Sequence, residues 1–521
     1  MSSRTIAGMS NANLYLALRA GFPADLDAIA VSCADGALGQ YRWRDLERGS
    51  AMLANLLDSL DLPRRSRVAV QVEKSVEALM LYLAVLRAGH VYLPLNTAYQ
   101  QAEIEYFISD AEPAVVVCAS RNFGWVSKIA FRAGAAKVFT LDEDRGGSLL
   151  ERASGLPDTH APAHVADDDL AAILYTSGTT GRSKGAMLTH ANLHSNAEVL
   201  RGYWDWQRSD VLIHALPIFH VHGLFVAIHG ALLNGSPMIW FARFDARACV
   251  ARLAEATIFM GVPTLYVRML GEAALTREAA ARMRLFISGS APLLTDTFKA
   301  WQERTGFTIL ERYGMSETLM LTSNPCRASD GERRAGTVGR ALPGVGVRVM
   351  DDADRPMAAD AIGHVQVRGP NVFAGYWRMP EKTREEFTTD GWFRTGDVGS
   401  LDTDGVLTLV GRSKDLIISG GFNVYPAEIE GFINDMPGVA ETAVIGVPHA
   451  DFGEAVVAVA IARPQAALSP EGIITELKGR IAGFKVPKAV IVEAELPRNA
   501  MGKVQKKLLR ERFAGLFVKS E

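Results

Sequence analysis

The most informative stretch of this 521-residue sequence is Tyr175-Thr176-Ser177-Gly178-Thr179-Thr180-Gly181-Arg182-Ser183-Lys184-Gly185, directly after the apolar run 170–174. An apolar run followed by glycines and hydroxyls predicts a buried strand that ends in a loop. Glycines free the backbone to turn, hydroxyls and N–H groups supply hydrogen-bond donors, and Lys184 adds a positive charge. A Ser/Thr/Gly-rich surface loop is the alternative. We favour a cradle for phosphate oxygens, which differs from a Walker A loop because no Gly-Lys-Ser/Thr triplet closes it.

Short β-branched runs alternate with helical patterns on both sides of this loop. Strands are predicted at 68–70, 91–93, 115–117, 211–216, 238–241, 258–261 and 285–288. Apolar strands that alternate with amphipathic helices are typical of parallel sheets covered by helices on both faces. After Arg348 the pattern changes to short β segments broken by Gly and Asp.

A domain boundary is predicted near Gly411, because the residues beyond it have a pattern of their own. Helices are predicted there at 427–434 and 470–482, and strands at 441–446, 454–461 and 489–493. We therefore expect an α/β fold in three parts. These are a large N-terminal body with parallel-rich sheets and a β-rich part (1–410), a hinge (411–415), and a small mobile C-terminal α+β domain (416–521).

Composition and charge are those of a globular enzyme. Hydrophobic residues make up 48% of the chain and charged residues 22%, which excludes a disordered chain. The net charge of −3 provides no basic field for nucleic acid or an anionic membrane. The four cysteines are too far apart for a zinc cluster or a disulfide scaffold, which favours the cytoplasm. The mitochondrial matrix is the alternative, since residues 1–24 contain arginines and no acid.

Residues 211–242 contain no Asp, Glu, Lys or Arg, yet we do not expect them to span a membrane. A membrane helix needs ~20 mainly apolar residues, whereas this segment contains His214, His220, His222, His229 and two prolines. The pattern predicts strand, loop, buried helix and strand. We expect no metal at these histidines, because no Cys, Asp or Glu lies near them in the sequence.

Further motifs follow the loop at 175–185 in a fixed order along the chain. They are Glu311-Arg312-Tyr313-Gly314-Met315-Ser316-Glu317, Arg394-Thr395-Gly396-Asp397, Gly411-Arg412-Ser413-Lys414-Asp415, Ser419-Gly420-Gly421-Phe422 and Pro497-Arg498-Asn499-Ala500-Met501-Gly502-Lys503. From about Asn11 onward the sequence resembles the adenylate-forming superfamily of acyl-CoA synthetases, luciferases and adenylation domains. The resemblance implies an enzyme that uses ATP, Mg²⁺ and, in the synthetases, coenzyme A.

The resemblance also implies roles for the motif residues. Lys503, Glu317, Thr176 and Lys184 are expected to be catalytic, with Glu317 as the Mg²⁺ ligand because a hard cation prefers carboxylate oxygen. Lys414 is expected at the hinge. Coenzyme A is expected at Ser419, Gly420 and Gly421. ATP is expected to bind Thr176, Ser177, Gly178, Thr179, Thr180, Gly181, Lys184, Gly289, Ser290, Ala291, Glu311, Arg312, Tyr313, Gly314, Ser316, Asp397, Arg412 and Lys503.

Within the superfamily the closest resemblance is to malonyl-CoA synthetases, through the segments 214–224 and 284–292. Period-two alternation places Arg284, Phe286 and Ser288 on one face of a strand. Because the loop after that strand flanks the acyl group in the superfamily, Arg284 is expected to bind a second carboxylate. His222 and Ser288 are expected beside it. An arginine that pairs with a structural carboxylate or faces solvent is the alternative.

The expected reaction joins malonate to coenzyme A and converts ATP to AMP and diphosphate through malonyl-AMP. Methylmalonate or another short dicarboxylate is an alternative substrate, because one methylene is worth only ~1–3 kcal/mol of discrimination. A nucleotide-binding protein without catalysis is an alternative from another class. The sequence indicates no nucleic-acid or membrane partner, and it does not determine the oligomeric state.

The resemblance predicts that Lys503 serves only the first half-reaction. Lys503→Ala should slow formation of the acyl-adenylate by about 10²–10⁴, the scale of losing one preorganised electrostatic group. Thioester formation from supplied malonyl-AMP and coenzyme A should stay within about tenfold, since it does not need that charge. A bulky residue at Gly421 should show the reverse. Single-turnover measurements of both steps test this prediction. Equal slowing of both steps by Lys503→Ala would contradict it.

Overall fold

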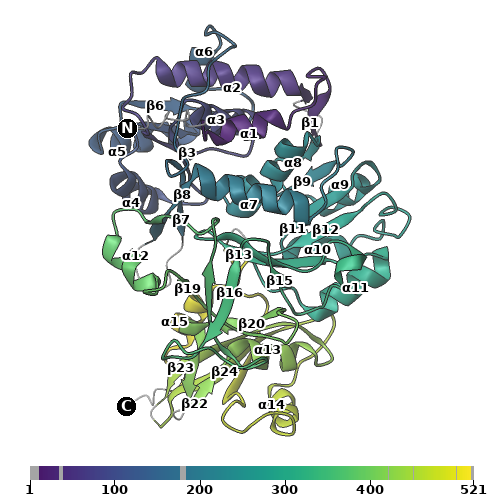
Figure 1. The fold of residues 1–521 in the computed structure, drawn as a ribbon. Helices are drawn as coiled ribbons and strands as arrows, with labels where there is room; N and C mark the ends of the chain where they lie inside the picture. Colours follow the sequence, from purple (N-terminus) through teal and green to yellow (C-terminus); the bar gives the residue numbers. More distant parts are fainter. Residues whose placement is uncertain are drawn as a thin grey trace, which may run out of the picture.

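The computed structural model describes residues 11–34, 39–176, 183–419, 422–449, 451–499 and 502–517. Figure 1 shows the N-terminal half in the upper part of the view and the last hundred residues at the bottom. Helices occur at α1 Leu14–Ala20, α2 Trp43–Asp58, α3 Val76–Arg87, α4 Gln101–Ala111, α5 Phe123–Arg132, α6 Ser148–Ala153, α7 His190–Tyr203, α8 His229–Asn234, α9 Ala246–Ala251, α10 Pro263–Leu270, α11 Thr295–Thr305, α12 Pro380–Glu386, α13 Pro426–Asn434, α14 Pro470–Lys478 and α15 Lys506–Phe513.

The first large sheet has seven strands in the order β18-β8-β7-β4-β3-β5-β6. Its strands are β3 Arg67–Gln71, β4 Val91–Pro94, β5 Val115–Cys118, β6 Lys137–Thr140, β7 Leu170–Thr176, β8 Lys184–Thr189 and β18 Gly375–Tyr376. The five strands from β7 to β6 pair in parallel. Strand β8 returns antiparallel to β7, so the loop between them joins two neighbouring strands at the carboxyl end of β7.

The second large sheet has nine strands in the order β15-β14-β13-β12-β11-β9-β10-β1-β2. Its strands are β1 Ile29–Cys33, β2 Gln40–Arg42, β9 Leu212–His214, β10 Met238–Trp240, β11 Ile258–Gly261, β12 Leu285–Ser288, β13 Leu310–Met315, β14 Leu319–Ser323 and β15 Arg340–Ala341. The run from β1 to β13 is parallel, and its strands are almost entirely buried. The predicted parallel-rich α/β fold is therefore confirmed.

Two smaller sheets follow. A four-stranded antiparallel sheet has the order β16-β17-β19-β20, with β16 Gly346–Met350, β17 Gly363–Arg368, β19 Phe393–Leu401 and β20 Leu407–Arg412. A five-stranded sheet contains β21 Ile417–Ser419, β22 Phe422–Val424, β23 Val439–His449, β24 Gly453–Ala462 and β25 Ala489–Glu493. A single 3₁₀ turn, Ser413–Asp415, separates β20 from β21. We propose this turn as the hinge between the large body and the small domain.

The uncharged segment 211–242 folds as its sequence predicts. It forms β9, a π-helix from His222 to Ile228, the helix α8 and the strand β10. Gly230 lies so close to the Trp206 ring that a Cβ would come within 2.5 Å of it, so only glycine fits there. In the part of the chain that the structure describes, no helix is long and apolar enough to cross a bilayer.

His229 illustrates how this core keeps imidazoles neutral. It is fully buried, and its Nε2 lies 2.8 Å from the Tyr82 hydroxyl. Burial lowers its pKa to about 3. The native state therefore resists protonation in a pH range where the unfolded chain, with a histidine pKa of about 6.5, takes up a proton.

The protein should therefore lose stability as the pH falls below about 6.5. Each such histidine contributes a slope of about 1.4 kcal/mol per pH unit between its two pKa values. His229→Gln, which keeps a polar group for Tyr82, should reduce the slope of the unfolding free energy by that amount. Urea unfolding between about pH 6.5 and 5 measures the slope. An unchanged slope would show that His229 is not the proton-linked group.

Candidate active site

The candidate site lies where the carboxyl ends of the parallel strands meet the small C-terminal sheet. Strand β12 ends at Ser288 and leads into Gly289, Ser290 and Ala291, while β7 ends at Thr176. In α/β sheets, ligands bind at the carboxyl ends of the strands, because the loops there converge. The predicted motif residues lie far apart in the sequence, and the fold brings many of them to this edge of the sheets.

An ion pair between β19 and β20 of the four-stranded sheet lies at this edge, and Tyr313 of β13 connects it to the second large sheet. Arg412 Nε lies 2.6 Å from Asp397 Oδ1, and the Tyr313 hydroxyl donates to the other oxygen of the same carboxylate. Asp397 and Tyr313 are buried. The Asp397 carboxylate raises the pKa of Arg412, against the opposing effect of burial. Three predicted nucleotide residues are thus in direct contact.

Lys503 lies close to this pair. Burial and the neighbouring Arg412 cation lower its pKa, while Asp397 and Asp415 oppose that shift. Its loop packs on helix α10, since a Cβ on Gly502 would lie 2.8 Å from Thr264 Oγ1. The small domain therefore presents Lys503 to the body in this structure.

A second group of predicted residues surrounds Glu317. This carboxylate is buried, and its Oε1 accepts a hydrogen bond of 3.1 Å from the Tyr376 hydroxyl. Lys184 Nζ lies 4.1 Å from the centre of the Tyr376 ring and 3.3 Å from Glu386 Oε1. Burial raises the pKa of Glu317, and the Arg412 and Lys184 cations oppose that shift. Thr176 lies at the start of the same loop, with its hydroxyl 3.4 Å from the Lys184 carbonyl.

The loop after β12 is held in an unusual backbone conformation. Ser290 has a φ of +72°, which is rare for a residue other than glycine and is a conformation found at functional sites. Its Oγ lies 3.4 Å from His222 Nδ1. His222 Nε2 and Ser288 Oγ are buried and have no hydrogen-bond partner among the described residues. These two orphaned polar atoms are candidates for contact with a ligand.

Glu311 and Arg312, which are expected at the nucleotide, have side chains that contact the loop after β12. Glu311 Oε1 accepts a hydrogen bond of 3.1 Å from the Leu293 N–H, and burial raises the pKa of this carboxyl to about 8. The Arg312 guanidinium packs on Gly289, where a Cβ would come within 2.4 Å of Nη1. Both side chains therefore contact residues of the loop after β12 and support its conformation.

Arg284 pairs with a carboxylate of the protein itself, which is the alternative role that the sequence leaves open for it. It precedes β12 and therefore lies at the amino end of the strand, opposite the end where Ser290 lies. Its guanidinium forms two hydrogen bonds to the buried Asp210, from Nε at 3.1 Å and from Nη2 at 2.6 Å. The alternation along the strand does not indicate which end of the strand faces the site.

The remaining predicted residues lie at the edge of the site or outside the described residues. Lys414 is in the turn after β20, and burial and Arg412 lower its pKa to about 8. Ser419 is buried at the end of β21. Gly314 lies in β13, and Ser316 lies in the turn between β13 and β14. Ser177, Gly178, Thr179, Thr180, Gly181, Gly420 and Gly421 lie outside the described residues.

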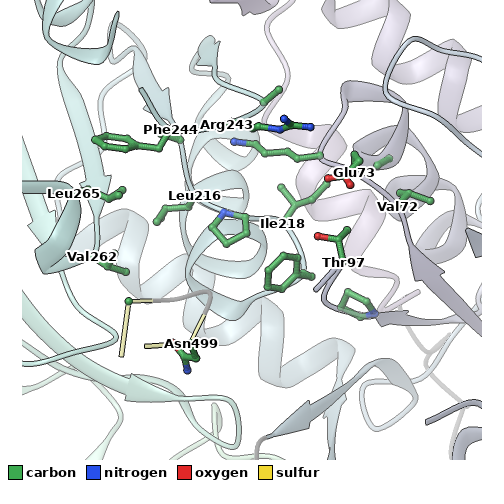
Figure 2. A pocket seen from close by; sticks show the side chains of 18 of the residues that line it. Val72, Glu73, Thr97, Leu216, Ile218, Arg243, Phe244, Val262, Leu265 and Asn499 are labelled. Atoms are coloured by element: carbon green, nitrogen blue, oxygen red, sulfur yellow. The ribbon is translucent and has the colours of Figure 1, made fainter. Parts of the chain in front are cut away.

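A cavity of about 450 Å³ lies beside the loop that carries Lys503, from which Arg498, Asn499 and Gly502 line it. We call this loop the lysine loop. Figure 2 shows Asn499 on one side of it and Arg243 and Glu73 on another, with Leu216, Ile218, Val262 and Leu265 between them. Arg268 also lines this cavity and is the functional candidate that the sequence reasoning missed. The sequence feature that could have identified Arg268 is its position in the segment directly after the predicted strand 258–261. That segment begins a helix at the carboxyl end of the strand.

Arg268 lies on the face of α10 that meets the lysine loop. It is four residues beyond Thr264, and residues at that spacing share one face of a helix. Among the described residues, no carboxylate pairs with Arg268. The other arginines of the cavity have acidic partners: Arg243 pairs with Glu143, and Arg498 pairs with Glu441. The cavity therefore contains one arginine whose charge is available to an anion.

Comparison with known proteins identifies the family. Residues 21–377 match the AMP-binding enzyme family, and residues 428–503 match the AMP-binding enzyme C-terminal domain. The malonate–CoA ligase of Arabidopsis thaliana is 34% identical over 478 residues, covering 86% of this chain and 78% of that protein. The long-chain-fatty-acid–CoA ligase FadD13 of Mycobacterium tuberculosis is 34% identical over 469 residues, with coverages of 88% and 91%.

Solved structures agree with this assignment. The crystal structure of ATP-bound MatB from Rhodopseudomonas palustris is 51% identical, with a TM-score of 0.94 over 97% of this chain and 100% of that chain. The apo form of the same protein gives a TM-score of 0.83. The chain belongs to the AMP-binding enzyme family, as its motifs predict. It is an ATP-dependent, AMP-forming acyl-CoA ligase, which excludes the alternative of a nucleotide-binding protein without catalysis.

The position of Arg284 leads to a prediction about stability. Arg284→Met should lower the free energy of unfolding by about 1–3 kcal/mol, because Asp210 stays buried and loses a charged partner. Turnover of malonate and of acetate should change by the same factor. Arg282→Met, at an exposed arginine two residues earlier, is the matched control. Chemical denaturation and initial rates measure both effects, and a loss confined to malonate would restore Arg284 as a substrate residue.

Proposed function

We propose that the protein is a malonate–CoA ligase that forms malonyl-CoA from malonate, ATP and coenzyme A. The observation that carries the proposal is Arg268, an arginine of the cavity with no carboxylate partner in the described part of the chain, on the helix face that meets the loop of Lys503. A monocarboxylic acid has no group that needs a second cation. A dicarboxylate does, and arginine binds carboxylates with two charge-assisted hydrogen bonds.

The orphaned atoms near Ser290 support the same substrate. Burial keeps the pKa of His222 well below its ordinary value, so the imidazole is neutral. When the Ser290 hydroxyl donates to Nδ1, the ring proton lies on Nε2, which has no protein acceptor among the described residues. We propose that His222 Nε2 and the Ser288 hydroxyl donate to the acid or its adenylate. The malonate–CoA ligase named among the relatives supports this assignment.

In the first half-reaction, an oxygen of the malonate carboxylate attacks the α-phosphorus of ATP. A P–O bond forms to the acid, the bond to the bridging oxygen of the β-phosphate breaks, and diphosphate leaves. Both reactants are anions, so we propose that Lys503, Lys184 and Arg412 neutralise charge and position the reacting oxygens. In the second half-reaction, the thiol sulfur of coenzyme A attacks the acyl carbon, AMP leaves, and the thiol loses its proton.

The chemistry at Glu317 fits a divalent cation that arrives with the nucleotide. Among the described residues, no three His, Cys, Asp or Glu side chains gather as a metal-binding group. Mg²⁺ in nucleotide sites is held by one or two carboxylates and by phosphate oxygens, so the single buried carboxylate of Glu317 is sufficient. When bound, Mg²⁺ would neutralise negative charge on the phosphates. Asp397 would receive the ribose hydroxyls, and Ser419 would face coenzyme A.

The proposal predicts a selective effect of Arg268. Arg268→Met should lower kcat/KM for malonate by about 10- to 100-fold, the value of a charge-assisted contact. Acetate should lose little, because it has no second carboxylate. Arg152→Met, at an exposed arginine of α6, is the control. AMP release measured with malonate, methylmalonate, succinate, acetate and a long-chain acid decides. Equal loss for malonate and acetate, or a preference of the wild type for a monocarboxylic acid, would refute the proposal.

A further inference from the structure

Tyr376 lies between two groups that the proposed mechanism uses separately. It is the last residue of β18, and 3% of it is exposed. Its hydroxyl donates to Glu317 Oε1 at 3.1 Å, while the face of its ring lies 4.1 Å from Lys184 Nζ. One side chain therefore contacts the proposed cation ligand through its polar end and the proposed phosphate-binding ammonium through its ring.

The backbone around Tyr376 ties the same two elements together. Strand β18 pairs with β8, so that Tyr376 lies opposite Ala186, two residues after Lys184. The Trp377 N–H donates to the Gly185 carbonyl at 2.8 Å. At the other end of the segment, the Phe373 N–H donates to the Glu317 carbonyl at 2.8 Å. The segment 373–377 thus fixes Glu317 and Lys184 relative to each other.

Charge explains why an aromatic ring suits this position. Lys184 Nζ has one carboxylate partner within the described residues, Glu386 at 3.3 Å, and Glu386 is shared with Lys382 at the same distance. A ring face attracts an ammonium without accepting its N–H groups in directed hydrogen bonds. Lys184 is thereby held in place while its donors remain available to phosphate oxygens.

We propose that Tyr376 is a positioning residue for the nucleotide, which orients Glu317 through its hydroxyl and Lys184 through its ring. The inference rests on the roles proposed above for Glu317 and Lys184. It implies that the two contributions can be separated, because phenylalanine keeps the ring and loses the hydroxyl, whereas leucine loses both.

Nucleotide binding, measured by calorimetry with ATP, tests the two contributions without turnover. Wild type, Tyr376→Phe and Tyr376→Leu are compared in EDTA and in Mg²⁺. Tyr376→Phe should bind ATP in EDTA within about twofold of wild type, because the ring under Lys184 remains. The gain in affinity on adding Mg²⁺ should shrink about tenfold, because Glu317 loses its orienting hydrogen bond. Tyr376→Leu should also lower the affinity for ATP in EDTA, by about tenfold.

Three controls separate this role from general damage. Tyr203→Phe removes the same hydroxyl from a tyrosine that donates to the Ser323 carbonyl at 3.3 Å, and it should bind like wild type under both conditions. Thermal unfolding reports whether each variant folds. Thioester formation from supplied acyl-adenylate and coenzyme A should stay within about threefold in Tyr376→Phe, since that step does not use the phosphates of ATP.

The outcomes distinguish this inference from the proposed function. If Tyr376→Phe keeps the full Mg²⁺ gain while Glu317→Gln loses it, the hydroxyl has no positioning role and the inference is overturned. If Glu317→Gln also keeps the gain, Glu317 is not the cation ligand, and the inference is overturned together with that assignment. The malonate proposal is unaffected by either result, because it depends on Arg268. If Tyr376→Phe lowers the affinity for ATP by the same factor in EDTA and in Mg²⁺, Tyr376 only supports the fold, and the inference is overturned.

Discussion

The ion pair between Arg412 and Asp397 is the interaction on which the site depends. It is built at the end of β20, directly before the turn that leads into the small domain, and Tyr313 connects it to the second large sheet. Lys503 lies beside it, and desolvation together with the Arg412 cation lowers the pKa of the lysine. In the function proposed above, the triphosphate of ATP would supply negative charge to these cations.

The two sides of the site differ in how their charged side chains are paired. On the side that contains Lys184, this ammonium pairs with Glu386, and the Glu317 carboxylate accepts a hydrogen bond from the Tyr376 hydroxyl. In the cavity beside Lys503, Arg268 has no carboxylate partner among the described residues, whereas Arg243 and Arg498 of the same cavity do. In the function proposed above, a substrate with a second carboxylate would pair with Arg268, and selectivity would follow from that charge.

The contacts that the sequence did not predict share one physical cause. Alternation along a strand predicts which residues share a face, but a parallel strand also has a direction, and ligands bind at its carboxyl end. Arg284 comes before the strand and therefore meets Asp210 at the amino end. Arg268 comes after a strand, on a helix whose register decides that it faces the lysine loop. Glu311 shows the same limit, since its carboxylate turns back to the Leu293 N–H.

The sequence by itself determined the class of enzyme, the alternation of strands and helices, and the motif residues whose chemistry requires a particular side chain. Lysines for phosphates, a carboxylate for a hard cation and glycines for tight turns are local requirements, and local sequence therefore carries them. The tertiary structure alone decided the contacts of Tyr376 and Arg284. These contacts join residues 59 and 74 positions apart. Only packing, which fixes the direction of each strand and the face of each helix, determines which charges meet across such separations.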